Sequence, residues 1–118
     1  MKTKKEYAQM TDHQINELVA ITRGTVLHSE NGKAIYAVEG LDLCTDFCNS
    51  WADAGPVIQA HGISLYHDNG EWEAEATLNA RLAVGSDEGV AVFASQKKPL
   101  RAAMIAFLMS QEKKEAEK

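Results

Sequence analysis

The sequence predicts a single α+β domain, residues 1–118, in which two or three helices pack on antiparallel hairpins. Three observations indicate this fold class: a helix-starting Thr-x-x-Gln motif, two Asn-Gly turns between β-prone segments, and a strongly apolar helical stretch near the end. The expected order is helix, hairpin, helix, hairpin or meander, and helix. With 118 residues and 45% hydrophobic content, the chain can bury about two-thirds of its unfolded surface. Residues 1–6 and 113–118 are expected to be flexible ends.

The first predicted helix begins after Thr11, because Thr11 and Gln14 have the spacing of a capping box. Ile15, Leu18, Val19 and Thr22 then follow one helical stripe, and Gly24 is expected to end the helix. The N-terminal residues MKTKKE look solvated, so ordered structure is expected to begin near Tyr7.

Two hairpins are predicted from Asn-Gly pairs, which supply the positive φ angles of a tight turn. The first joins residues 25–28 to residues 33–38 around Glu30-Asn31-Gly32. The second joins residues 63–67 to residues 72–77 around Asp68-Asn69-Gly70-Glu71. Both pairs of flanking segments are β-prone.

A short helix is expected from Trp51 to His61, after an irregular segment, LDLCTDFCNS. Gly62 is expected to end it in the left-handed conformation. Pro56 must lie in the first turn of this helix or kink it, since proline has no N–H to donate deeper in a helix.

The last third of the chain is expected to hold a loop, a strand and a helix. Residues 85–89 have loop composition, residues 89–94 alternate like a strand, and Pro99 suits a first helical position. Apolar side chains surround almost the whole helix over residues 99–112. The helix is therefore either central to the core or half covered by a partner, and the protein is a monomer or a homodimer.

The net charge of −5 conceals an uneven distribution. Residues 1–36 hold five bases and four acids, residues 37–95 hold one base and ten acids, and residues 96–118 hold six bases and three acids. The acidic middle repels phosphates and favours a basic partner, so it is not expected to bind nucleic acid directly. Lys97, Lys98 and Arg101 lie where the helix dipole disfavours cations, and the acidic middle could supply the anions they need.

Localisation is expected to be the cytoplasm of a bacterial host. No apolar run is long enough to cross a bilayer, and the first residues lack the apolar stretch of a secretory signal. Cys44 and Cys48 are too few for a disulfide framework, and cytosolic thiols are normally reduced.

Two segments carry a family resemblance: CNSWADAGPVIQAHGI, residues 48–63, and PLRAAMIAFLMSQE, residues 99–112. Together they resemble the NinX family of small accessory proteins from phages and prophages. The resemblance implies a phage or prophage accessory protein but supplies no catalytic or binding residues, because the family has no assigned biochemical role. Residues 78–96 interrupt the pattern, which usually passes more quickly to the last helix.

Within the first segment, Asn49, Trp51 and Asp53 form a candidate recognition patch, since Trp is enriched at binding hot spots. The favoured alternative is structural: Trp51 packs on the core while Ser50 caps the helix. Trp72, which opens a strand after a turn, is also expected in the core.

Cys44, Cys48, His61 and His67 satisfy the loose spacing of a two-Cys, two-His zinc site. In a zinc finger both histidines lie on one helix, whereas Gly62 should end the helix directly after His61. The prediction is therefore no metal and no cofactor, with this set as the alternative. The simpler explanation is that the two cysteines act as small hydrophobic side chains and that the two histidines lie apart on the surface.

Glu71, Glu73 and Glu75 alternate with apolar residues, so a strand would place their carboxylates on one face about 6.6 to 7 Å apart. That separation approaches the phosphate repeat of a nucleic-acid strand and allows a mimic of nucleic acid. The simpler interpretation is the solvent face of an amphipathic strand.

No catalytic residues are predicted, because the sequence lacks a nucleophile elbow, a phosphate-binding glycine loop and a zinc-protease motif. A small enzyme remains as an alternative, in which His28, His61 or His67 would meet carboxylates in a cleft. The favoured hypothesis is a non-enzymatic module that binds a host or phage protein through Asn49, Trp51, Asp53 or the three glutamates. The main alternative is an acidic nucleic-acid mimic or a nucleic-acid-linked factor that uses the basic ends of the chain.

Overall fold

The computed structural model describes residues 3–30, 33–38, 41–77 and 91–116. Its helices are α1 (Lys4–Ala8), α2 (Asp12–Arg23), α3 (Trp51–His61) and α4 (Pro99–Ala116). Its strands are β1 (Thr25–Glu30), β2 (Lys33–Val38), β3 (Leu41–Thr45), β4 (Ser64–Asp68), β5 (Glu71–Thr77) and β6 (Ala91–Gln96). The predicted α+β class is confirmed.

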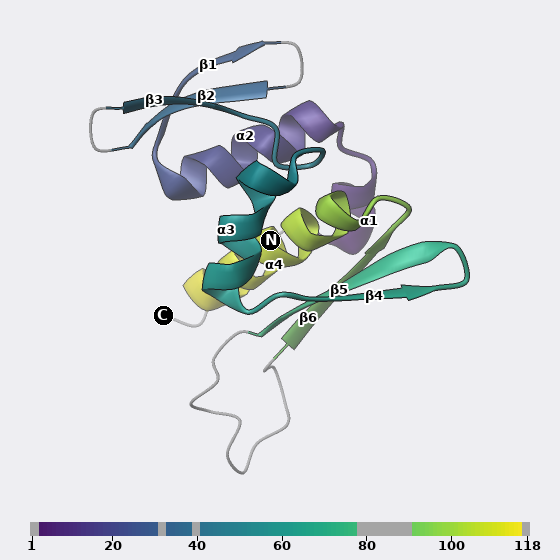
Figure 1. The fold of residues 1–118 in the computed structure, drawn as a ribbon. Helices are drawn as coiled ribbons and strands as arrows, with labels where there is room; N and C mark the ends of the chain where they lie inside the picture. Colours follow the sequence, from purple (N-terminus) through teal and green to yellow (C-terminus); the bar gives the residue numbers. More distant parts are fainter. Residues whose placement is uncertain (1–2, 31–32, 39–40, 78–90, 117–118) are drawn as a thin grey trace.

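The strands form two separate antiparallel sheets with the helices between them (Figure 1). Sheet A has the order β1-β2-β3 and sheet B has the order β4-β5-β6. Helix α2 lies against β1 and β2, whereas α4 lies across β5 and β6 and also contacts the other three helices. Helix α4 is therefore the element that joins the two halves of the molecule.

Both N-terminal helices begin with a capping box. Thr11 Oγ1 accepts a hydrogen bond from the N–H of Gln14, and the Thr11 N–H donates to Gln14 Oε1, as predicted. Thr3 and Glu6 make the same reciprocal pair at the start of α1. Helix α1 was not predicted, and helices extend into both segments that the sequence predicts to be flexible ends.

Helix α3 has its predicted bounds and caps. Ser50 accepts the N–H of Asp53, and Gly62 has a φ of 61° while its N–H donates to the carbonyl of Ile58. Of the two alternatives for Pro56, the first turn is wrong, because Pro56 is the sixth residue of the helix. Pro56 is exposed and follows Gly55, whose lack of a Cβ relieves the clash with the proline ring.

Strands β4 and β5 form the second predicted hairpin, and Asn69 and Gly70 take the expected positive φ values of 52° and 79°. The strands of the first predicted hairpin are also present as β1 and β2, while its Asn31-Gly32 turn lies outside the described residues. The irregular segment predicted for residues 41–50 is partly wrong, because Leu41–Thr45 pairs with β2 as β3.

The core is centred on α4. Leu100, Met104 and Leu108 are buried, and so are all the residues between them. They pack with Ile15 and Val19 of α2 and with the inward side of sheet B. Of the two positions expected for this helix, the central one is therefore confirmed.

Two further predictions concern the region before α4. The loop predicted at residues 85–89 lies outside the described residues, whereas β6 occupies part of the strand predicted for residues 89–94. Within the described ranges, every helix is either too short or too polar to cross a lipid bilayer.

We predict that Met104→Ala lowers the free energy of unfolding by about 3 kcal/mol, because it opens a cavity at a fully buried position of α4. Urea denaturation measures the change. Ile21→Ala, at a side chain that is 57% exposed, should stay within about 0.5 kcal/mol of the native protein. Equal losses for both variants would contradict the central position of α4.

Candidate functional site

A network of polar side chains joins α1, α2, α3 and α4, and Arg101 lies at its centre. The Arg101 residue is only 8% exposed. Its Nη1 donates to Asp12 Oδ1 at 2.8 Å and its Nε donates to Gln96 Oε1 at 3.0 Å. Its Nη2 donates to the main-chain carbonyls of Tyr7, Ala8 and Met10. One guanidinium thus holds the end of α1, the start of α2 and the end of β6 against α4.

Asp12 is the carboxylate that pairs with Lys98 and Arg101 at the start of α4. It accepts hydrogen bonds from Lys98 and Arg101 and a weaker one, at 3.3 Å, from Asn49 Nδ2. Burial alone would raise the pKa of Asp12, but the bonds from Lys98 and Arg101 lower it below its ordinary value. The expectation that the acidic middle supplies this anion is wrong, since Asp12 precedes that block.

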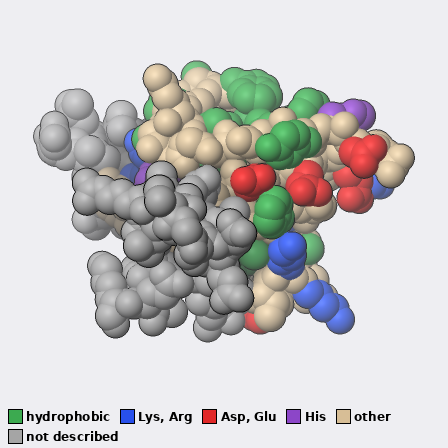
Figure 2. Space-filling view, turned by 90° about the horizontal axis from the view of Figure 1, so that it is seen from below, with side chains coloured by type: hydrophobic (Ala, Val, Ile, Leu, Met, Phe, Trp, Pro, Cys, Tyr) green, Lys and Arg blue, Asp and Glu red, His purple; other side chains and the backbone are tan. Residues whose placement is uncertain are grey.

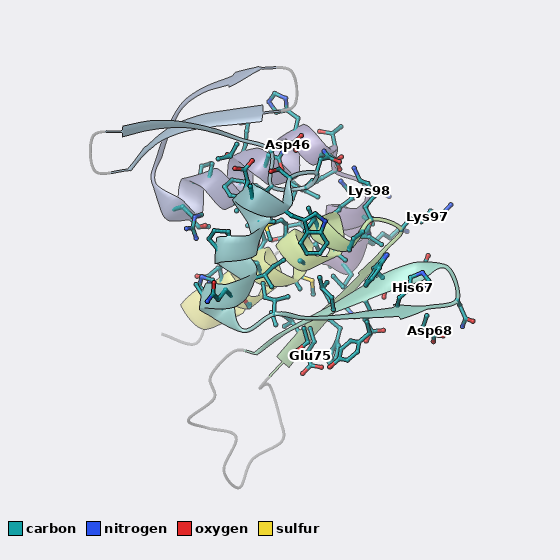
Figure 3. The ribbon with its side chains drawn as sticks, in the orientation of Figure 1. Asp46, His67, Asp68, Glu75, Lys97 and Lys98 are labelled. Carbon is teal, nitrogen blue, oxygen red and sulfur yellow. The ribbon has the colours of Figure 1, made fainter. Side chains whose placement is uncertain are left out.

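The acidic middle joins the network through two asparagines. Asn16, which is completely buried, donates from Nδ2 to Asp46 Oδ1 at 2.8 Å and accepts the N–H of Cys48 at 3.0 Å. Asn49 Nδ2 also donates to Asp46 at 3.0 Å, while its Oδ1 accepts from Lys98 Nζ at 3.0 Å. Figure 3 shows Asp46 and Lys98 on the same side of the molecule.

This network explains two of the three residues in the candidate recognition patch. Asn49 is engaged by Asp12, Asp46 and Lys98, and Asp53 Oδ2 accepts the N–H of Asp46 at 2.9 Å. Both side chains therefore fix the loop before α3. Trp51 differs, because it is 58% exposed, and the expected packing of Trp51 on the core is wrong. Trp72 is half-buried and packs against the core, as expected.

The four residues of the zinc alternative lie in different surroundings where the structure describes them. Cys48 is buried, its pKa is raised to about 12 by burial and by the charge of Asp12, and its Sγ lies 3.9 Å from the Asp12 carbonyl. The His61 ring contacts Phe107 and the His67 ring contacts Trp72. The side chain of Cys44 lies outside the described residues. In the part that is described, no three His, Cys, Asp or Glu residues are grouped as metal ligands.

The outward side of sheet B brings the three predicted glutamates together with two exposed aromatic rings. Strand alternation and exposure place eight residues there, which we call the acidic face: Ser64, Tyr66, Asp68, Glu71, Glu73, Glu75, Phe93 and Ser95. Acidic side chains cross this face in a row with hydrophobic side chains on both sides (Figure 2).

The register shows how the row is flanked. Tyr66 is the cross-strand partner of Glu73, and Phe93 is the partner of Glu75. Tyr66 is 51% and Phe93 is 39% exposed. The glutamates were predicted from sequence, but the aromatic residues were not, because only the strand pairing places them beside the carboxylates.

A shallow hollow lies at the β6 border of the acidic face and has a volume of about 260 Å³. Lys4 and Lys5 of α1 line it together with Ser95 and Gln96 of β6. Positive charge therefore borders this side of the face. The other border, β4, ends in Asp68, and the sequence holds no Lys or Arg between residues 34 and 80.

We predict that Asp12→Asn lowers the free energy of unfolding by about 2 kcal/mol near neutral pH, because Arg101 loses a charged acceptor. The folded-state pKa of Asp12 lies below its unfolded value. Its contribution is therefore complete above the unfolded value of about 3.9 and is lost as the pH falls through the folded value. The difference between native protein and variant should shrink below about pH 4, as measured by urea denaturation at several pH values. A difference that stays constant into strong acid would contradict this assignment.

We also predict that Arg101→Lys lowers the free energy of unfolding by about 3 kcal/mol, since an ammonium cannot reproduce the fork of donors at this buried position. The matched control is Arg23→Lys, the same change at an exposed position of α2, which should change stability by less than about 0.5 kcal/mol. Thermal and urea unfolding of both variants provide the test, and a near-neutral Arg101→Lys would refute the central role of Arg101.

The family model described as "Bacteriophage P22, NinX" matches residues 6–111, which include the polar network, both described strands of the second hairpin and most of α4. No curated protein matches the chain. The match covers most of the sequence and agrees with the resemblance carried by residues 48–63 and 99–112. The chain therefore belongs to the bacteriophage P22 NinX family.

Proposed function

We propose that this protein is a non-enzymatic phage accessory protein that binds a basic protein of the host or the phage through its acidic face. The observation that carries the proposal is the row of Glu71, Glu73 and Glu75 between exposed Tyr66 and Phe93. Membership in a phage family supports the accessory role. The cytoplasm of the bacterial host is the compartment that this role requires.

The combination of aromatic rings and carboxylates favours a protein partner. Tyr is enriched at binding hot spots, where its ring provides contact area and its hydroxyl a hydrogen bond. Carboxylates around such rings select a positively charged surface and speed its approach. The acidic face therefore suits a partner that combines Lys or Arg with apolar groups.

The polar network supports a structural role for the other predicted residues. Asn49 and Asp53 use their side chains to fix neighbouring elements, and Cys48 is buried with a raised pKa. A buried thiol with a raised pKa is a poor nucleophile. These groups therefore add no support to an enzymatic function.

A second function is favoured by the spacing of the carboxylates. Glu71, Glu73 and Glu75 share one face of β5, so their repeat is about 6.6 to 7 Å. If the protein mimics nucleic acid, its partner is a nucleic-acid-binding protein, and single-stranded or duplex DNA should displace that partner. If DNA does not compete, the binding of another class of basic protein is favoured.

We predict that changing Glu71, Glu73 and Glu75 to Gln abolishes capture of the partner while leaving the fold intact. The test is affinity purification of the tagged protein from phage-infected or lysogenic cells, with mass spectrometry of the eluate. Tyr66→Ala should weaken binding of the captured partner by at least about tenfold, or about 1.4 kcal/mol.

The control is Ile21→Ala, which removes an exposed apolar side chain on α2 rather than on the acidic face. It should capture the same partner as the native protein. Capture of the same proteins by native and glutamine variants, or an eluate without any specific basic protein, would contradict the proposal.

A further inference from the structure

We infer that the partner binds as an extended basic segment that adds a strand to the open edge of β4. This inference rests on the proposed function, because it specifies the form in which a basic partner would meet the acidic face. It follows from the strand order of sheet B, the hydrogen-bonding phase of the hairpin and the uneven charge at the two edges of the sheet.

Strand β4 is the last strand on its side of sheet B, and within the described chain it pairs only with β5. Its two-residue turn, Asn69-Gly70, makes Asp68 and Glu71 the closing pair. In such a hairpin the closing residues bond to each other and the bonding direction then alternates. The N–H and C=O groups of Leu65 and His67 therefore point to the open edge.

An edge with unpaired backbone groups is a template for an added strand. Every residue of β4 except Leu65 is exposed. The alternate side chains of an added strand would lie on the outward side, about 4.8 Å from Ser64, Tyr66 and Asp68. The cationic group of a lysine or arginine at those positions could extend toward the three glutamates of β5 and make a cation–π contact with the Tyr66 ring.

Charge distinguishes this edge from the opposite one. Lys4 and Lys5 line the hollow beside β6, so a basic segment is repelled there. The β4–β5 hairpin carries Asp68, Glu71, Glu73 and Glu75 without any Lys or Arg. Figure 3 shows Asp68 near the hairpin tip and Glu75 at the other end of β5, so negative charge accompanies the whole edge.

The same charge disfavours a second copy of this chain as the occupant. Antiparallel pairing of two β4 edges would join two acidic faces into one continuous surface, and each copy carries a net charge of −5. Like charges brought together across strands are destabilising. A segment with Lys or Arg at alternate positions replaces this repulsion by attraction. Such a segment is therefore the occupant that best fits the β4 edge.

The decisive comparison is between His67→Pro and His67→Ala. Both remove the imidazole that contacts Trp72, but only proline removes the outward N–H of residue 67. The probe is a short synthetic peptide with alternating Lys and Thr, titrated by calorimetry at low salt. We expect His67→Ala to bind it like the native protein and His67→Pro to bind it at least about tenfold more weakly.

Four further measurements allow the inference to be refuted. Urea denaturation compares the folding of the two variants. If His67→Pro does not fold, a peptide N-methylated on its pairing edge replaces it and should lose binding to the native protein. A peptide of equal charge with consecutive lysines should bind more weakly, and amide exchange at Leu65 and His67 should slow only with the alternating peptide.

The outcomes separate the inference from the proposed function. Equal peptide binding by His67→Pro and His67→Ala overturns strand addition. Sedimentation equilibrium that shows a native dimer lost in His67→Pro overturns it in favour of self-pairing. If the peptide fails to bind while a basic protein is still captured through the three glutamates, the strand addition fails and the proposed function stands. If capture also fails, both are refuted.

Discussion

The arrangement of the helices depends on a single buried cation. Arg101 belongs to the first turn of α4, where the helix dipole disfavours positive charge, and burial adds a desolvation cost. Both costs are offset because its donors meet Asp12, Gln96 and the main-chain carbonyls of Tyr7, Ala8 and Met10. The same contacts that satisfy the guanidinium therefore fix three neighbouring segments relative to α4. Helix α4 in turn fixes sheet B, which it covers on the inward side.

Placing α4 in the centre determines which surfaces remain for binding. Its residues from Leu100 to Leu108 are buried on all sides, so the helix that looked suitable for a dimer has no free apolar face along that stretch. The inward side of sheet B is used by the same packing, with Ala74, Ala76 and Ala94 against α4. Small residues let the helix approach the sheet closely. The outward side is left to solvent, and there the aromatic rings of Tyr66 and Phe93 are exposed.

Local signals in the sequence predicted most of the elements but few of the contacts between them. Thr11 with Gln14, Ser50, Gly62 and the Asn69-Gly70 turn act within a few residues, so their patterns predict helix and hairpin bounds well. Strand β3 was missed because Asp42 is atypical of strands, and pairing with β2 outweighs that preference. Asn16 and Asp12 were missed for another reason: their partners lie 30 or more positions away, and periodicity carries no information at that range. The need of Lys98 and Arg101 for an anion could be predicted, but not its identity.

The acidic face is poorly explained by stability alone. Three carboxylates repeat along one strand, and the cross-strand partners are Tyr66 beside Glu73 and Phe93 beside Glu75 rather than lysine or arginine. A cross-strand pair of opposite charges at such a position would stabilise the sheet by about 0.2 to 1 kcal/mol. Elsewhere in the described chain, Lys98 and Arg101 at the start of α4 are paired with Asp12, so this protein pairs its charges where a fixed arrangement requires it. On the acidic face the carboxylates instead lie among exposed aromatic rings. The sequence around β4 and β5 holds no Lys or Arg between residues 34 and 80 that could pair with them. Such a surface becomes favourable when a partner supplies the positive charge and covers the rings.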